Sequence, residues 1–368
     1  AGKSLCYQLS ALLLPGTTLV ISPLIALMKD QLDGLPSEIS SQATTIKSTL
    51  GGAELEARLA RASAGPYKLL YAAPERFRQR PFLGTLKRAG ISLMVVDESH
   101  CVSLWGHDFR PDYHFISRVW KELGQPPILA MTATATPRVR DDVQAALGQM
   151  RLVLTDIQRP NLFLQALGFV REAEKRQALL SLCREIEGSG IVYARSRAKC
   201  EQLAEMLRND GVSATHYHAG IRDRAAAQDR FMSDQVRVVV ATIAFGMGVD
   251  KADVRFIIHY DLPKSLENYF QEAGRAGRDG LPARCILFHS RADMGIVRRL
   301  TRQDTLQAEF LRRTYANLER RLGTEGTGLV SMPDLERDLQ TDSTRLRVAV
   351  QFLERAGLLW RGYDLPRT

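Results

Sequence analysis

The sequence predicts an α/β protein made of two parallel-sheet lobes, followed by a small helical or winged-helix-like C-terminal unit. Short runs of β-branched residues alternate with amphipathic segments of helix length over most of the chain. The runs are almost wholly apolar, which is typical of parallel strands covered by helices on both faces. The alternation occurs twice, and a break near residues 156–161 containing the turn-forming sequence Arg159-Pro160-Asn161 separates the two series.

Each lobe is expected to contain its own series of strands. In the first lobe the runs are Thr17–Ile21, Lys68–Tyr71, Ser92–Val96 and Ile128–Met131. In the second lobe they are Gly190–Tyr193, Ala214–Tyr217, Val236–Ala241, Phe256–His259 and Cys285–Phe288. Because helix-length segments separate consecutive runs, the strands of each lobe are expected to pair in parallel through helical crossovers.

The C-terminal part of the chain has a different pattern. The strand pattern ends after about Asp293, and a basic helical segment follows over Val297–Arg321. A glycine-rich stretch at 323–328 leads to a short helix, a turn, a longer amphipathic helix and a Gly-centred hairpin, which together predict a winged helix. We therefore expect four parts, at residues 1–158, 159–295, 296–325 and 326–368.

Composition limits the classes of function. The chain has 50 Lys and Arg against 41 Asp and Glu, a net charge of +9 that favours a polyanionic partner. No apolar stretch approaches the length of a membrane span. With no secretory signal and five scattered cysteines, we expect a cytoplasmic protein with reduced thiols. The chain does not begin with Met and opens inside a motif, so we expect it to be truncated at its N-terminus.

Polar residues at predicted strand ends point to phosphate chemistry. Gly2-Lys3-Ser4 is the closing half of the phosphate loop G-x-x-x-x-G-K-S/T, in which Lys contacts phosphates and the hydroxyl binds Mg²⁺. Asp97 directly follows the run ending at Val96 and is expected to hold Mg²⁺ with Ser4. Glu98 is expected to activate the attacking water. Each acid alone is equally consistent with a solvated strand end.

Phosphoryl transfer also requires positive charge near the transferring group. Residues 271–280 place Arg275 and Arg278 between glycines, which would let both guanidinium groups extend toward a facing lobe. Two arginines in a turn are also common as plain surface charge, and this alternative stays open.

Together these motifs resemble those of superfamily 2 helicases, and the fit is close enough to name the RecQ family of DNA helicases. The motifs occur in family order: GKSLCYQ (2–8, motif I), ISPLIALMKDQ (21–31, Ia), YAAPERF (71–77, Ib), DESH (97–100, II), MTATAT (131–136, III), IVYARSR (191–197, IV), ATIAFGMGVDKADVR (241–255, V) and QEAGRAGR (271–278, VI). The resemblance implies two RecA-like lobes, ATP and Mg²⁺ as cofactors, and 3′-to-5′ movement on single-stranded DNA. It also implies unwinding of forked duplexes in DNA repair and recombination.

The segment after motif II resembles the aromatic-rich loop of the RecQ family. Trp105 and Phe109 offer stacking faces for unpaired bases, while His107 and Arg110 add polar contacts. The resemblance implies that single-stranded DNA moves this loop and thereby stimulates ATP hydrolysis. The alternative is that the two aromatic residues are core residues under a loop.

The resemblance assigns further residues by position. His100 would link the nucleotide site to Thr132 and Thr134. Nucleotide contacts are implied for Asp250 and Gln271. Contacts to the DNA backbone are implied for Ser22, Pro23, Arg195, Ser196, Thr242, Gly246 and Gly248.

Two departures from the family pattern matter. Ser99 replaces the usual Ala of the D-E-x-H box, a tolerable change between small residues. The family's zinc-binding subdomain needs four cysteines after the second lobe, and no Cys follows Cys285, so no zinc is expected. His216 and His218 are not expected to bind a metal, because nothing near them in the sequence completes a site.

Two other functions remain open. A double-strand DNA translocase would use the same motor, and the missing front of the phosphate loop is compatible with a non-catalytic DNA-binding protein. The sequence does not distinguish protein partners or oligomeric state.

Overall fold

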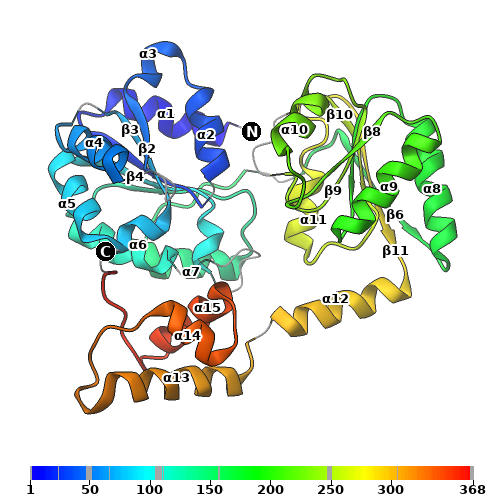
Figure 1. The fold of residues 1–368 in the computed structure, drawn as a ribbon. Helices are drawn as coiled ribbons and strands as arrows, with labels where there is room; N and C mark the ends of the chain where they lie inside the picture. Colours follow the sequence, from blue (N-terminus) through cyan, green and yellow to red (C-terminus); the bar gives the residue numbers. More distant parts are fainter. Residues whose placement is uncertain are drawn as a thin grey trace. The chain divides into compact units, whose positions relative to one another are not determined.

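A computed structural model describes residues 2–23, 25–46, 52–65, 67–103, 110, 112–155, 158–246, 251–304 and 306–364 (Figure 1). The chain divides into two compact units. One, here called the lobe-1 unit, contains residues 2–150 and 303–368; the other, the lobe-2 unit, contains residues 151–302. No helix in the described ranges combines the length and the apolar character needed to cross a membrane.

The lobe-1 sheet is parallel, with strand order β2-β3-β1-β4-β5. Its strands are β1 (Thr17–Ile21), β2 (Ala43–Ile46), β3 (Leu69–Ala72), β4 (Ile91–Val96) and β5 (Ile128–Ala130). All four strands predicted in this lobe are present within one residue at each end, and the predicted parallel pairing is confirmed. The edge strand β2 was not predicted.

Helices cover both faces of this sheet (Figure 1). They are α1 (Lys3–Leu13), α2 (Ile25–Asp33), α3 (Ser37–Ser40), α4 (Gly52–Ser63), α5 (Arg80–Ala89), α6 (Tyr113–Glu122) and α7 (Pro137–Leu147), with 3₁₀ turns at Pro74–Arg78 and Ser99–Val102. Alternate residues of β4 belong to different cores: Met94 and Val96 pack with α4 to α7, whereas Leu93 and Val95 pack with α1 and α2. Burial on both faces explains why the strand is almost wholly apolar, with Ser92 as its one polar residue.

The lobe-2 sheet is also parallel, with order β6-β11-β10-β7-β9-β8. Its strands are β6 (Leu162–Gly168), β7 (Ser189–Tyr193), β8 (Ala214–Tyr217), β9 (Val238–Ala241), β10 (Val254–His259) and β11 (Ala283–His289). The predicted strands are all present. The edge strand β6 follows the predicted linker directly and was not predicted.

Helices α8 (Glu172–Glu185) and α9 (Arg197–Asn209) pack on one face of the lobe-2 sheet. Helices α10 (Arg224–Met232) and α11 (Leu266–Ala273) pack on the other face. Helix α12 (Arg291–Asp304) follows β11. Both lobes therefore have the layered parallel architecture in which ligands bind beyond the carboxyl ends of the strands.

The C-terminal residues form a helical cluster with its own core. Helices α13 (Ala308–Leu322), α14 (Met332–Leu339) and α15 (Ser343–Arg355) bury Phe310, Leu335, Leu339, Leu346, Ala349 and Val350. The predicted Gly-centred hairpin is not formed by the described residues 356–364. Instead, Asp364 donates its backbone N–H to the carbonyl of Arg78 at 2.9 Å and makes an isolated bridge with Gln79 of lobe 1.

Candidate functional site

The first part of the site is the start of helix α1. Gly2 precedes the helix with φ 85°, a left-handed conformation that favours glycine, and no side chain caps the first turn. The first N–H groups of the helix therefore have no intrahelical or side-chain acceptor, which is the usual arrangement of an anion site. Lys3 and Ser4 are the first two helical residues, and both are half-buried.

Asp97 follows the end of β4 and is buried, with 4% of its surface exposed. Its Oδ1 accepts the backbone N–H of Glu98 at 2.9 Å. Burial raises the pKa of Asp97, and the positive charge of Lys3 opposes that shift. The carboxylate that was predicted to hold Mg²⁺ therefore lies close enough to Lys3 to interact with it.

Glu98 has a strained backbone conformation. Its φ of 46° and ψ of 47° lie in the left-handed region, which is unusual for a residue with a side chain. This conformation turns the chain sharply after β4, and the Glu98 carboxylate reaches in two directions. Its Oε1 lies 3.7 Å from Nζ of Lys3, and its Oε2 lies 3.3 Å from Nδ1 of His100.

His100 connects Glu98 to the loop after β5. Its Nδ1 lies 2.9 Å from Oγ1 of Thr132, the contact that the resemblance implied. The Thr132 hydroxyl donates to the carbonyl of Thr134 at 2.9 Å and accepts that residue's N–H at 3.2 Å. Because the hydroxyl proton is used there, we assign the proton between His100 and Thr132 to Nδ1 of His100.

The segment after motif II is anchored at both of its ends. Trp105, His107 and Phe109 lie outside the described residues. At the far end, Arg110 donates from Nη1 to the carbonyl of Pro23 at 2.8 Å. Tyr113, which the sequence did not single out, donates its hydroxyl to the carbonyl of Asp97 at 3.0 Å.

Three of the residues predicted to contact DNA have side chains that are buried or already in contact with other groups. Ser22 is fully buried, and its hydroxyl has no hydrogen-bond partner among the described residues. Arg195 in lobe 2 faces acids: its Nη2 lies 3.8 Å from Oδ1 of Asp261 and 3.6 Å from Oδ1 of Asp293. Thr242 is half-buried, and its hydroxyl accepts the N–H of Ala244 at 3.4 Å.

The motif VI residues differ in burial. Arg275 is buried, with 8% exposed, whereas Gln271 and Arg278 are half-buried. Arg275 lies over Gly246 of motif V, where an added Cβ would come within 2.7 Å of its Nη2. Gly248 and Asp250 lie outside the described residues.

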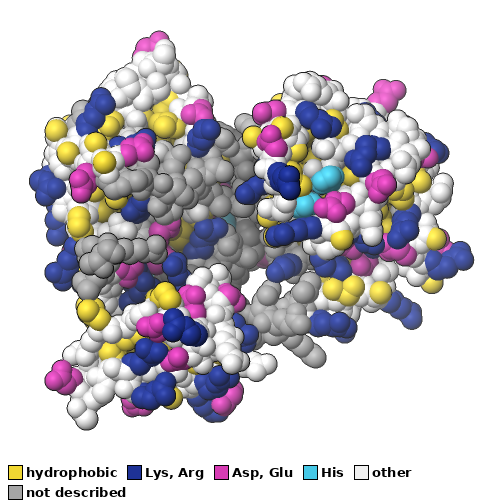
Figure 2. Space-filling view, in the orientation of Figure 1, with side chains coloured by type: hydrophobic (Ala, Val, Ile, Leu, Met, Phe, Trp, Pro, Cys, Tyr) yellow, Lys and Arg dark blue, Asp and Glu magenta, His cyan; other side chains and the backbone are white. Residues whose placement is uncertain are grey.

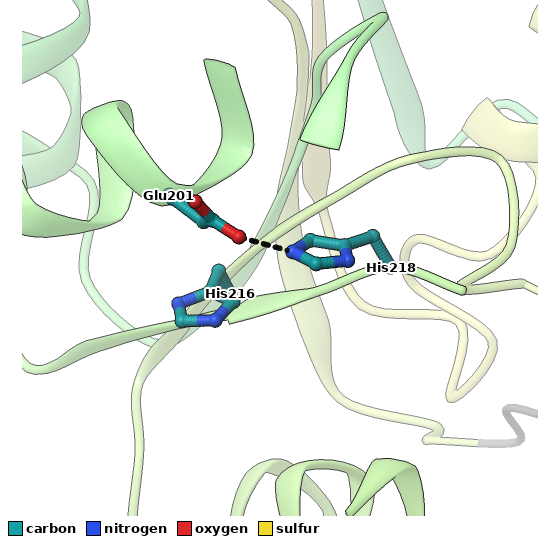
Figure 3. A group of neighbouring side chains, drawn as sticks. All are labelled: Glu201, His216 and His218. Atoms are coloured by element: carbon teal, nitrogen blue, oxygen red, sulfur yellow. Dashed lines mark hydrogen bonds and ion pairs between the residues drawn. The ribbon is translucent and has the colours of Figure 1, made fainter. Parts of the chain in front are cut away.

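The reason given for excluding a metal at His216 and His218 is wrong, because Glu201 of α9 completes a group of three possible ligands (Figure 3). Their potential ligand atoms all lie within 4.8 Å of one another. However, His218 uses both ring nitrogens: Nδ1 accepts the N–H of Gly220 at 3.2 Å, and Nε2 lies 2.9 Å from Oε1 of Glu201. A His218 ring that accepts at Nδ1 carries its proton on Nε2 and donates it to Glu201, so it has no lone pair left for a metal.

All five cysteines are free thiols. Burial raises the pKa of Cys183, Cys200 and Cys285 to about 12, so these thiols keep their protons at neutral pH. On the face of the molecule in Figure 2, described Lys and Arg side chains are interspersed with Asp and Glu on both units. The net charge of +9 is therefore not gathered into one basic patch on that face.

Comparison with known proteins identifies the family. Residues 1–143 match the DEAD/DEAH box helicase family, and residues 174–280 match the helicase conserved C-terminal domain. The chain is 40% identical over 333 residues to a probable ATP-dependent DNA helicase RecS of Bacillus subtilis, covering 87% of this chain and 67% of the relative. It is 43% identical over 309 residues to the ATP-dependent DNA helicase RecQ of the same organism.

The chain belongs to the RecQ family of ATP-dependent DNA helicases. The match to the Bacillus subtilis RecQ helicase covers 82% of this chain and 51% of the relative, so the chain spans about half the length of that protein. A mouse relative, ATP-dependent DNA helicase Q5, is 44% identical over 83% of this chain and 33% of its own length.

Solved structures agree with the fold expected for the RecQ family. A Mycobacterium smegmatis helicase Lhr, solved with single-stranded DNA and AMP-PNP, matches 94% of this chain and 50% of its own with a TM-score of 0.60. The DUF1998 helicase MrfA, solved with DNA, matches 81% of this chain and 44% of its own with a TM-score of 0.63. At 21% and 20% identity, these likenesses show the fold of two RecA-like lobes.

Proposed function

We propose that this chain is the motor of an ATP-dependent DNA helicase. It would hydrolyse ATP, move 3′-to-5′ along single-stranded DNA and separate forked duplexes in DNA repair and recombination. The observation that carries the proposal is the chain of contacts from Lys3 through Glu98 and His100 to Thr132, because it joins the phosphate-binding helix to both strand-end motifs. Family membership supports the choice of DNA as substrate.

The residues at the carboxyl edge of the lobe-1 sheet fit ATP with Mg²⁺. Lys3 and the uncapped N–H groups of α1 would bind phosphate oxygens. Ser4 and Asp97 offer the hydroxyl and carboxylate oxygens that Mg²⁺ prefers, and the buried Asp97 carboxylate has its charge balanced by Lys3. When bound, Mg²⁺ would neutralise charge on the phosphates. Glu98 would take the proton of the attacking water, and His100 would hold its carboxylate in place.

A positive charge from lobe 2 would complete the reaction. Of the two motif VI arginines, Arg278 is less buried than Arg275, so we assign the main stabilisation of transition-state charge to Arg278. Asp250 and Gln271 remain proposed nucleotide contacts. The proposed division into parts at 1–158, 159–295, 296–325 and 326–368 assigns the first two to the helicase lobes.

DNA binding would act on the catalytic acids through the loop between Glu98 and Tyr113. The loop is held to motif Ia by Arg110 and to the Asp97 carbonyl by Tyr113. If Trp105 and Phe109 stack on bases and His107 and Arg110 meet phosphates, a shift of the loop is transmitted directly to the backbone beside Glu98. Ser22, Arg195 and Thr242 would contribute backbone contacts after local rearrangement.

The test is to measure ATP hydrolysis with single-stranded, forked and blunt DNA, and unwinding of duplexes with a 3′ or a 5′ tail. We expect single-stranded DNA to stimulate hydrolysis and the 3′-tailed duplex to be unwound. Stimulation by blunt duplex without strand separation would indicate a double-strand translocase. DNA binding with no ATP hydrolysis would indicate a non-catalytic DNA-binding protein.

A further inference from the structure

A buried chain of polar side chains in lobe 2 leads from Glu272 through His259 to Tyr193, and Tyr193 bonds to the loop on which Arg275 packs. His259 in β10 is fully buried, and its Nε2 lies 2.8 Å from Oε2 of Glu272, which is itself 6% exposed. Nδ1 of His259 is buried with no hydrogen-bond partner among the described residues. A proton on Nδ1 would be unsatisfied, which favours the tautomer in which Nε2 donates to the carboxylate.

The His259 ring also holds Tyr193 in place. The two rings stack with centroids 5.4 Å apart and planes inclined by 23°. Burial raises the pKa of Tyr193 to about 12, so its hydroxyl keeps its proton at neutral pH. That hydroxyl donates to the carbonyl of Phe245 at 2.9 Å, in the loop after β9. The next residue in this loop, Gly246, is the one against which the Arg275 guanidinium packs.

Arg275 contacts both its own turn and the loop after β9. Its backbone N–H donates to the carbonyl of Glu272 at 3.2 Å. Its guanidinium occupies the space that a side chain at position 246 would fill, since a Cβ there would lie 3.0 Å from Cζ. The buried chain thus joins the end of β7, the loop after β9 and the turn after α11. These three segments belong to motifs IV, V and VI, which lie apart in the sequence.

We propose that Tyr193, His259 and Glu272 are positioning residues that hold the loop after β9 in the place where Arg275 packs on it, so that segments 241–246 and 271–278 move together during ATP turnover. This inference rests on the proposed ATPase function. It gives Tyr193 a role that acts through Phe245 and Gly246 on Arg275, which joins the turn after α11 to the loop after β9. The buried pair of His259 and Glu272 fixes the orientation of the tyrosine ring.

A double-mutant cycle tests the proposal. Tyr193→Phe removes only the hydroxyl, and we expect it to lower kcat for DNA-stimulated ATP hydrolysis on the order of tenfold, with KM for ATP and DNA affinity within about twofold. In the Arg275→Ala background the same change should have no further effect, because no guanidinium then packs on the loop that the hydroxyl holds. Tyr217→Phe is the matched control: its ring also packs on Phe245, at 4.7 Å between centroids, and it should retain full turnover.

A conservative variant of Glu272 tests the other end of this series of contacts. Glu272→Gln keeps an oxygen that can accept from Nε2 of His259 and should retain turnover within about twofold, whereas Glu272→Ala should lower it as Tyr193→Phe does. Independent, multiplicative effects of Tyr193→Phe and Arg275→Ala would overturn the proposal. So would normal turnover of Tyr193→Phe in an active protein.

Amide hydrogen exchange gives a readout that does not depend on activity. Loss of the Tyr193 hydroxyl should speed exchange in residues 242–246, whereas Tyr217→Phe should leave it unchanged. If Tyr193→Phe exchanges these amides at the same rate as the wild type, the inference is contradicted, whether or not the protein hydrolyses ATP. If the wild-type protein does not hydrolyse ATP but Tyr193→Phe still speeds exchange in residues 242–246, the proposed ATPase is contradicted and the positioning role of Tyr193 is not.

Discussion

At the scale of single residues, the backbone of Glu98 is the clearest sign of a functional site. A residue with a side chain in the left-handed region costs on the order of 1 to 3 kcal/mol, and such strain persists where the surrounding structure holds it. Here the strain brings one carboxylate between Lys3 and His100. A side chain kept in this position at such a cost is well suited to act on a water molecule.

We therefore predict that Glu98→Gln lowers kcat for ATP hydrolysis by roughly 10² or more while ATP affinity changes only a few-fold. The amide keeps the size of the side chain but takes no proton, and Asp97, the proposed Mg²⁺ ligand, is unchanged. Single-turnover hydrolysis and nucleotide-binding titrations check both parts. Glu56→Gln, at an exposed position on α4, is the control. Parallel loss of binding and turnover would contradict the general-base role.

His114 gives a prediction on stability. Burial, with a contribution from Arg355, lowers the pKa of His114 to about 4. The unfolded chain takes up this proton near pH 6.5, so between about pH 6.5 and 4 the unfolded state binds more protons and stability falls as the pH falls. We expect about 2 kcal/mol of the free energy of unfolding to be lost between pH 7 and 5 through this residue.

The measurement is urea unfolding followed by tryptophan fluorescence, since all three tryptophans, Trp105, Trp120 and Trp360, belong to the lobe-1 unit. His114→Gln should flatten the dependence of the lobe-1 transition on pH over this window. Equal slopes in the variant and the wild type would show that His114 is not the titrating group.

At the scale of elements, helix α12 is attached to lobe 2 by a buried ion pair. Nζ of Lys175 on α8 lies 2.9 Å from Oδ2 of Asp293 on α12, and both side chains are almost fully buried. Removing one partner would leave an uncompensated charge. We predict that Asp293→Ala destabilises the lobe-2 unit by roughly 3 kcal/mol, whereas Lys175→Met with Asp293→Leu costs much less.

The stability of lobe 2 can be measured by hydrogen exchange of the β10 amides. Tryptophan fluorescence does not report on it, because lobe 2 contains no tryptophan. Asp210→Ala, which breaks the exposed pair with Arg184, is the control and should change stability by less than about 1 kcal/mol. An equal loss in the single and the double variant would mean that packing, not charge, attaches α12.

The elements also show what the sequence could and could not predict. Central strands such as β4 are almost wholly apolar because both faces are buried over most of their length, so their pattern is easy to recognise. The edge strands β2 and β6 were missed because they are short or partly exposed: β2 contains two threonines, and β6 exposes Phe163. In the described residues 356–364 the predicted hairpin is not formed, and the backbone N–H of Asp364 instead donates to the carbonyl of Arg78, a partner 286 positions away that the local sequence does not reveal.

The same distinction holds for the site. Residues in contiguous motifs, such as Asp97 and Glu98, could be assigned from order and spacing. Tyr113, Tyr193 and His259 could not, because their roles depend on partners that only the fold brings near. Tyr193 and the Phe245 carbonyl, for example, are 52 positions apart in the chain.

At the scale of the whole molecule, the net charge of +9 sets the expected behaviour toward DNA. On the face shown in Figure 2 the described positive charges are interspersed with acids, and Arg195 lies close to Asp261 and Asp293, so we expect only part of the basic content to meet phosphates. We predict that single-stranded DNA binding weakens with salt, with a slope of log K against log [salt] equal to about −0.7 per phosphate contact and a total of only several contacts.

Base preference should be weak, because stacking on aromatic side chains and contacts to phosphates do not read sequence. Fluorescence anisotropy with labelled oligothymidine and a mixed-sequence strand of equal length, at salt concentrations from about 50 to 300 mM, measures both properties. Arg110→Ala should reduce the slope by about one contact if that guanidinium leaves Pro23 to meet a phosphate, and should leave it unchanged if Arg110 serves only as a tether. Binding that is insensitive to salt, or strongly selective for one base, would contradict a backbone track and require base-edge contacts instead.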